Sequence, residues 1–169
     1  VVATKTINAE MFAKMFLAGA KNLESKKEWI NELNVFPVPD GDTGTNMSMT
    51  MMSGVRDIQN SEAISISEIS KTLSRGLLMG ARGNSGVILS QILKGICNVI
   101  GTCEKEITTK QFAKALAEGS AIAYKAVAAP KEGTILTVIR VIAESAQRNC
   151  KKHTNFEPFF EAILNDGEA

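Results

Sequence analysis

The spacing of apolar side chains constrains this chain more than any other feature, because it is helical almost from end to end. Apolar residues that recur every three or four positions form one face of a helix. Across the 169 residues this recurrence appears in seven stretches, which are 11–33, 47–58, 66–77, 88–99, 112–126, 135–146 and 159–163. We expect the first stretch to break near Ser25. The pattern predicts a single all-α domain over residues 1–169, with short connections between its helices.

Local signals mark where several of these helices begin. Thr108 stands three residues before Gln111, which is the spacing of a capping box. Ser65 can cap the helix that follows it. The one candidate strand, residues 35–38, is interrupted and followed by prolines, which cannot donate the hydrogen bonds of a sheet. We therefore expect no regular strand.

The charge balance and the cysteine count exclude several classes of function. Lys and Arg total 19 against 18 Asp and Glu, so the net charge of +1 gives no support for nucleic-acid binding. Three cysteines without a CxxC pair argue against a disulfide framework or a four-cysteine zinc site, and plain thiols fit the reducing cytoplasm. No apolar run approaches the roughly 20 residues that cross a bilayer. We also expect a fragment of a longer protein, because the chain lacks an initiator Met.

The strongest chemical signal is the loop 34–46, which reads Asn-Val-Phe-Pro-Val-Pro-Asp-Gly-Asp-Thr-Gly-Thr-Asn. Asp40 and Asp42 are one residue apart and can converge on one divalent cation, since carboxylate oxygens suit Mg²⁺ or Ca²⁺. The loop then enters a helix whose first N–H groups, near Thr45 and Asn46, are available to an anion. The pattern predicts a metal site that presents a nucleotide phosphate.

Three rival interpretations of this loop predict different surroundings. The plainest is an Asx-rich turn that only caps a helix. An EF-hand needs an acidic residue at its twelfth position, and counting from Asp40 that position is Met51. Phosphatases of the haloacid dehalogenase type share the Asp-x-Asp spacing, but they need a buried strand where Pro37 and Pro39 stand. The capping turn and the metal site both remain open.

A second Gly-rich segment, 80–86, leads into a helix that we expect to begin near Val87. Its glycines, with Asn84 and Ser85, would make a phosphate nest at a helix N-terminus. It is not a P-loop, because no Lys follows its last Gly. A plain helix–helix connection is the alternative, with Arg82 facing either phosphate or solvent. If both loops act together, one supplies metal ligands and the other supplies phosphate donors.

Two further residues have less specific signals. Thr134 precedes the stretch 135–146 and is either a helix cap or one wall of a nucleotide site. His153, the only histidine, lies in a polar stretch and is not expected to act as a base or a ligand.

Three segments in the same order, 34–47, 80–91 and 132–138, carry a resemblance that covers nearly the whole chain. They closely resemble the N-terminal domain of the bacterial fatty acid kinase A subunit, within the family of the nucleotide-binding L subunit of dihydroxyacetone kinase. The resemblance implies a barrel of about seven to eight antiparallel helices. ATP or ADP and two Mg²⁺ ions would bind in loops at one end, and the family's last helix is expected to be missing here.

The resemblance also implies roles for individual residues. Asp40 and Asp42 match the catalytic, metal-binding carboxylates, and Asn34 lies near the position of a third ligand. The residues expected around the nucleotide are Thr43, Gly44, Thr45, Asn46, Gly83, Asn84, Ser85, Gly86 and Thr134. A separate fatty-acid-binding protein would bring the acyl chain, the product would be an acyl phosphate, and missing downstream domains could form a homodimer.

Two departures from the dihydroxyacetone kinases bear on the substrate. Those subunits carry Asp where this chain has Asn34 and His where it has Thr43. Both differences favour the fatty acid kinase branch, an ATP-dependent phosphotransferase. The alternatives are a dihydroxyacetone kinase subunit and a regulatory module that holds metal and nucleotide without transferring phosphate.

Overall fold

The computed structural model describes residues 4–35 and 40–169 and confirms the all-α prediction. Two short strands, β1 (Ile7–Asn8) and β2 (Glu106–Ile107), also occur in this part of the chain. Its eight helices are α1 (Ala9–Ser25), α2 (Lys27–Glu32), α3 (Thr43–Gln59), α4 (Ile66–Met79), α5 (Gly83–Ile100), α6 (Thr109–Ala126), α7 (Ile135–Asn149) and α8 (Phe156–Glu168).

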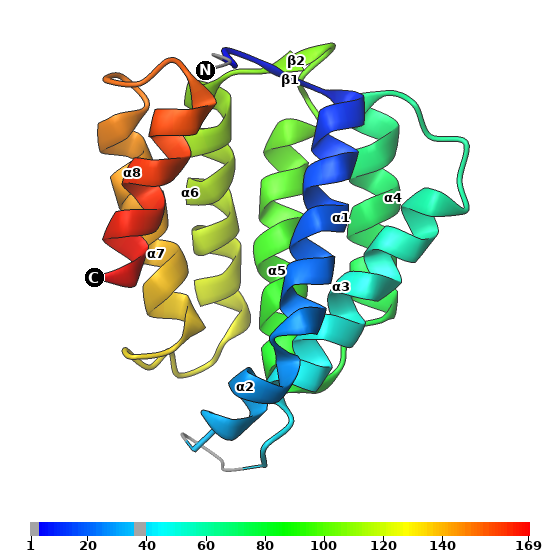
Figure 1. Cartoon of the computed structure of the whole chain (residues 1–169), viewed down its shortest axis with the longest axis vertical. Helices are drawn as coiled ribbons and strands as arrows, with labels where there is room; N and C mark the ends of the chain where they lie inside the picture. The colour runs from blue at the N-terminus through cyan, green and yellow to red at the C-terminus, as the bar shows by residue number, and fades with distance from the viewer. Residues whose placement is uncertain (1–3, 36–39) are drawn as a thin grey trace.

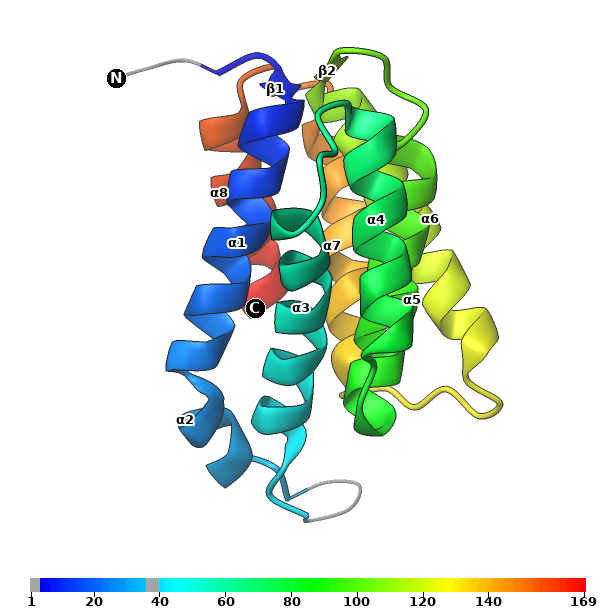
Figure 2. The same ribbon diagram turned by 90° about the vertical axis from the view of Figure 1, so that its right-hand side faces the viewer.

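The long helices lie side by side and alternate in direction along the chain, as the antiparallel prediction requires (Figure 1). Helices α3, α5 and α7 begin at the end of the bundle from which α2 projects, which we name the α2 end (Figures 1 and 2). Helices α1, α4, α6 and α8 begin at the opposite end. Three helix N-termini, with the partial positive charge that a helix N-terminus carries, are therefore gathered at the α2 end.

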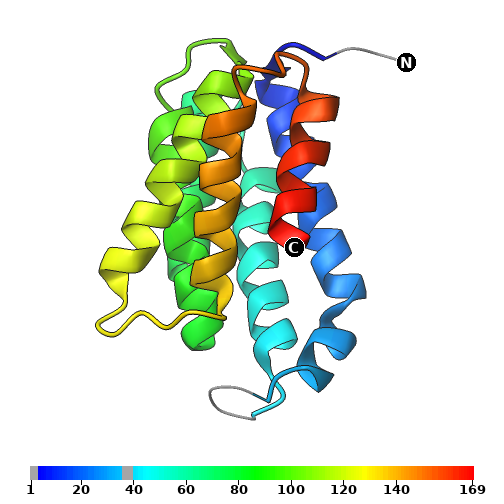
Figure 3. The same ribbon diagram turned by 90° about the vertical axis from the view of Figure 1, so that its left-hand side faces the viewer.

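The bundle has two halves that meet between α5 and α6. Helices α6, α7 and α8 form one side, whereas α1, α3, α4 and α5 form the other (Figures 1 and 3). The two halves approach closely because Gly95 and Gly119 face each other. A Cβ atom added at Gly95 would lie 2.6 Å from the Cα of Gly119, so a larger side chain would force α5 and α6 apart.

The core is mainly apolar, with a few buried Ser and Thr side chains, and it includes a cluster of phenylalanines on the α6–α8 side. Phe12, Leu73 and Ile100 are essentially inaccessible to solvent on the other side. The ring centroids in the cluster are 5.3 to 6.4 Å apart, and its members are Phe112, Phe156, Phe159 and Phe160. Phe156 and Phe159 are fully buried, and complete burial of such a side chain contributes about 1.5–3 kcal/mol. In the described residues, no helix is long and apolar enough to cross a membrane.

Most of the expected helix boundaries are confirmed. Helix α1 ends at Ser25, where the break was expected. The hydroxyl of Ser65 accepts a hydrogen bond from the N–H of Glu68 at 3.1 Å. Thr108 and Gln111 form the reciprocal hydrogen bonds of a capping box. Local capping chemistry therefore sets the starts of α4 and α6.

Two expectations about secondary structure are wrong. Helix α5 begins at Gly83 rather than near Val87, because small polar residues can form a first helical turn without adding to an apolar stripe. The expectation of no strand also fails, since Ile7 pairs with Ile107 in an antiparallel ladder. A two-residue strand is too short to show alternation. Most of the candidate strand 35–38, with Pro37 and Pro39, lies outside the described residues.

Candidate nucleotide and metal site

The segment before α3 carries two carboxylates that face solvent. Asp40 and Asp42 are both exposed, and Asp42 occupies the N-cap position of α3 without capping the helix through its side chain. Within the described residues, neither carboxylate makes a hydrogen bond or an ion pair. Hard oxygen atoms without competing partners are the donors that a divalent cation prefers.

A complete metal site is not preformed from acidic side chains. In residues 4–35 and 40–169, no three Asp, Glu, His or Cys side chains gather where they could hold a metal ion. A cation at Asp40 and Asp42 would therefore need further oxygen atoms from the backbone, from water or from a phosphate. Mg²⁺ is commonly bound in this way, through one or two carboxylates and the phosphates of a substrate.

Asn34 holds the start of α3 in place. Its Oδ1 atom accepts hydrogen bonds from the N–H groups of Asp42 at 3.3 Å and Thr43 at 3.1 Å, and from the hydroxyl of Thr43 at 2.5 Å. The helix is therefore capped from the preceding segment, which leaves the Asp42 carboxylate to solvent. The capping-turn interpretation is thus correct for the backbone, but the capping side chain is Asn34.

Helix α2 packs against the first turn of α3. Asn31 accepts a hydrogen bond from the N–H of Thr45 at 3.1 Å and donates one to the Thr45 hydroxyl at 2.9 Å. Gly44 is buried, and a Cβ atom there would collide with the carbonyl of Lys27. These contacts fix the first turn of α3 at the α2 end. The sequence did not single out Asn31, because an Asn in a short helix has no distinctive spacing.

The first turns of α3 and α5 lie against each other, as the two-loop hypothesis requires. Gly83 has a φ of +67°, and a Cβ atom there would lie 2.5 Å from the side-chain nitrogen of Asn46. The Thr50 hydroxyl donates to the carbonyl of Asn46 at 2.7 Å and accepts from the N–H of Arg82 at 3.1 Å. A Cβ atom at Gly86 would collide with that same hydroxyl.

The backbone at the start of α5 is therefore close to α3 and bare of bulky side chains. Asn84 is exposed and Ser85 is half-buried in this first turn. The first four N–H groups of a helix lack partners within it, and they carry a partial positive charge. The first turn of α5 thus offers N–H donors to an anion. In the first turn of α3, the N–H groups of Thr43 and Thr45 already donate to Asn34 and Asn31. Thr50, which links them, was not predicted, because its position in α3 shows no motif.

Thr134 lies at the α2 end, at the start of α7. Its hydroxyl accepts a hydrogen bond from the N–H of Leu136 at 3.3 Å and donates to the carbonyl of Lys131 at 2.7 Å. The cap interpretation of Thr134 is confirmed. Its role as a wall of the nucleotide site stays a prediction. In that role the methyl group or the backbone of Thr134 would contact the nucleotide, because the hydroxyl already makes two hydrogen bonds.

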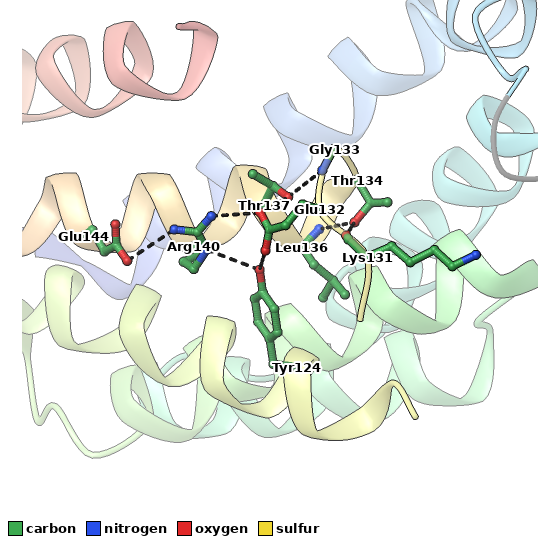
Figure 4. Close-up of polar contacts among 9 residues, drawn as sticks. All are labelled: Tyr124, Lys131, Glu132, Gly133, Thr134, Leu136, Thr137, Arg140 and Glu144. Atoms are coloured by element: carbon green, nitrogen blue, oxygen red, sulfur yellow. Dashed lines mark hydrogen bonds and ion pairs between the residues drawn. The ribbon is translucent and has the colours of Figure 1, made fainter. Parts of the chain in front are cut away.

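A polar cluster surrounds Glu132, next to Thr134 in the chain (Figure 4). Hydrogen bonds from Thr137 and Arg140 lower the pKa of the Glu132 carboxyl. Hydrogen bonds with Tyr124 and Glu132 raise the pKa of the Arg140 guanidinium. The sequence does not reveal this cluster, because its members come from two helices and their connection and show no joint spacing.

A cleft of about 360 Å³ opens beside the first turn of α3 and reaches the residue before α5. Three basic side chains face one acidic side chain in it, which favours an anionic occupant. Its lining residues are Glu24, Lys27, Thr45, Ser48, Met49, Met52, Ser53, Arg56, Gly80 and Arg82. Arg82 is exposed, so its side chain is available to an anion at the α2 end.

The chain is similar in sequence to several bacterial proteins. It is 47% identical to Protein YloV of Bacillus subtilis over 168 residues, which is 99% of this chain and 30% of that protein. It is 53% identical over 141 residues to an uncharacterized protein of Staphylococcus epidermidis, covering 83% of this chain and 25% of the relative. An uncharacterized protein of Staphylococcus aureus strain USA300 is 50% identical over 157 residues, covering 93% and 28%.

This chain therefore spans between a quarter and a third of the length of the relatives that it matches. The family model of the DAK2 domain matches residues 37–169, which is most of the chain. That match includes both carboxylates, the first turns of α3 and α5, and Glu132 with its partners. The chain belongs to the DAK2 domain family, the nucleotide-binding, kinase-related modules similar to the L subunit of dihydroxyacetone kinase.

Proposed function

We propose that this chain is a kinase domain that binds Mg·ATP at the α2 end and transfers the γ-phosphate to a fatty acid carboxylate held by a separate protein. The observation that carries the proposal is the pairing of the α3 and α5 N-termini beside two solvent-facing carboxylates. Family membership supports the nucleotide-binding part. The fatty acid acceptor rests on the resemblance at Asn34 and Thr43.

Asp40 and Asp42 would hold the metal, since both carboxylates are exposed and have no partner among the described residues. Bound Mg²⁺ would supply neutralisation of the charge on the β- and γ-phosphates. We assign Asn34 to holding the segment that carries Asp42, because its Oδ1 atom already accepts three hydrogen bonds. A ligand role for Asn34 would require it to release some of them.

The N–H groups at the start of α5 would orient the phosphates, because those of Thr43 and Thr45 in α3 already donate to Asn34 and Asn31. Phosphate oxygens accept hydrogen bonds from such groups, and the partial positive charge of a helix N-terminus favours the anion. The glycines at 83 and 86 matter because any side chain there would meet Asn46 or Thr50 and separate the two turns. Arg82 can add a positive charge at the edge of the same region.

The acceptor chemistry needs no general base from this chain. A fatty acid carboxyl with a pKa near about 4 is ionised at neutral pH, so its oxygen can form the new bond to the γ-phosphorus directly. The bond from that phosphorus to the bridging oxygen of ADP breaks, and ADP leaves with the electron pair. The only histidine, His153, lies in the connection between α7 and α8. That connection is at the end opposite the α2 end (Figure 1), so His153 is remote from this chemistry.

The test combines binding to this chain with turnover by the full-length protein. Asp40→Asn and Asp42→Asn should abolish Mg-dependent ADP binding in calorimetry and acyl phosphate formation with the loaded partner protein. Glu62→Gln removes an exposed carboxylate in the α3–α4 connection and should leave both unchanged. Wild-type turnover of dihydroxyacetone but not fatty acid would replace the acceptor, whereas binding without any transfer would favour a regulatory module.

A further inference from the structure

The connection between α6 and α7, residues 127–134, is held by side chains on both helices. Figure 4 shows the carboxylate of Glu132 at the centre of these contacts. We name this group the Glu132 cluster, and its other members are Tyr124, Thr137, Arg140 and Glu144. The connection ends at Thr134, at the α2 end, the residue that the resemblance expects to form one wall of the nucleotide site.

Both oxygen atoms of the Glu132 carboxylate accept hydrogen bonds. Oε2 accepts from the Thr137 hydroxyl at 2.8 Å and from a guanidinium nitrogen of Arg140 at 2.9 Å. Oε1 accepts from the Tyr124 hydroxyl at 3.4 Å. Tyr124 comes from α6, whereas the other two donors come from α7. The position of Glu132 is therefore set from two helices.

The same contacts reach the backbone. The N–H of Gly133 donates to the Thr137 hydroxyl at 2.9 Å, so that hydroxyl joins the Glu132 carboxylate to the next peptide group. Gly133 has a φ of +80°, a conformation that favours glycine. Thr134 follows directly and caps α7. Hydrogen bonds thus run from Arg140, in α7, to the peptide group between Glu132 and Gly133, directly before Thr134.

The cluster is too exposed to contribute much to global stability. The side chains of Arg140 and Glu132 are 39% and 65% exposed, and ion pairs in such settings contribute little. Arg140 also pairs with Glu144 at 3.5 Å, on the side away from the connection. Two carboxylates therefore bind one guanidinium, but only Glu132 also holds the α6–α7 connection. Local order of that connection is the property that Glu132 controls.

We propose that Glu132 is a positioning residue for the nucleotide, acting through Thr137 and Gly133 to hold Thr134 and the start of α7 against it. The proposal rests on the proposed function, because it presumes a nucleotide at the α2 end. Arg140 and Tyr124 act through the carboxylate and touch no substrate. The start of α7 would contact the nucleoside part of ATP or ADP. The metal and the phosphates are assigned to Asp40, Asp42 and the start of α5, which leaves the nucleoside for a third helix.

The experiment compares Glu132→Gln with Glu144→Gln, which removes the other carboxylate that pairs with Arg140. Calorimetry with Mg·ADP should show about fivefold weaker binding for Glu132→Gln, the effect of about one hydrogen bond, and an unchanged affinity for Glu144→Gln. Amide hydrogen exchange across 131–138 should quicken only in Glu132→Gln. The double variant Glu132→Gln with Arg140→Gln should bind no more weakly than the weaker single variant, because both act through one cluster.

Three results would overturn the proposal. Equal affinity of wild type and Glu132→Gln would show that the cluster does not serve the nucleotide. Additive losses in the double variant would show that Glu132 and Arg140 act separately. Failure of the wild-type chain to bind Mg·ADP would overturn the proposed function together with this inference, so the two failures are distinguishable.

Discussion

Replacing Asn34 separates its capping role from a role in metal binding. Asn34→Ala removes the Oδ1 atom that accepts three hydrogen bonds at the start of α3, at 3.3, 3.1 and 2.5 Å. Loss of a helix cap costs about 1–2 kcal/mol. For a domain of this size that cost lowers the Tm by about 2–8 °C. Thermal unfolding followed by circular dichroism without metal measures it directly.

Asn34→Asp keeps an acceptor oxygen and adds a negative charge next to a helix N-terminus, which favours the folded state by about 0.3–1 kcal/mol. Its Tm without metal should therefore equal that of the wild type or lie slightly above it. Asn60→Ala is the matched control, because Asn60 lies exposed at the other end of α3. If Asn34→Ala melts at the wild-type temperature, the capping role is wrong. If Asn34→Ala keeps the wild-type Tm but binds Mg²⁺ more weakly, Asn34 is a metal ligand instead.

Three further predictions test other parts of the structure. Gly83→Ala should lower the free energy of unfolding by at least about 1 kcal/mol, because Gly83 has a positive φ and lies close to Asn46. Gly19→Ala should raise it by up to about 1 kcal/mol, because Gly19 is in a helix with open space around it. Chemical denaturation measures both changes. Burial raises the pKa of the Cys97 thiol to about 12, so a thiol reagent should modify it only when the chain unfolds. The Glu132 carboxyl has a lowered pKa, so its contacts should be fully formed above the ordinary value of 4.5 and be lost as the pH falls through the lowered value. The NMR signal of the Gly133 amide should therefore stay constant above pH 4.5 and shift only below it.

The helices could be predicted because each one buries a continuous stripe, and burial imposes the 3.6-residue period on the sequence. Their starts could be predicted where a side chain caps its own helix, as at Ser65 and Thr108. The start of α5 could not, because Gly83 and Gly86 are required by contacts with Asn46 and Thr50 rather than by local propensity. A glycine in a sequence does not reveal which neighbour approaches it.

The candidate site shows the same division. Asp40 and Asp42 stood out because two carboxylates around a glycine are chemically distinctive, and the structure leaves both open to solvent. Asn34 also stood out, but its use as a cap across eight or nine residues depends on how the loop folds back. The Glu132 cluster depends on Tyr124 from another helix, and no local pattern joins that residue to the rest.

The alternating direction of the helices has a consequence for how the protein meets its ligand from a distance. Helices α3, α5 and α7 point one way and α1, α4, α6 and α8 the other, so their axial dipoles largely cancel outside the bundle. The net charge of +1 adds almost nothing. A distant nucleotide is therefore not steered toward the α2 end, and the attraction begins only near contact. The association rate should then vary little with ionic strength.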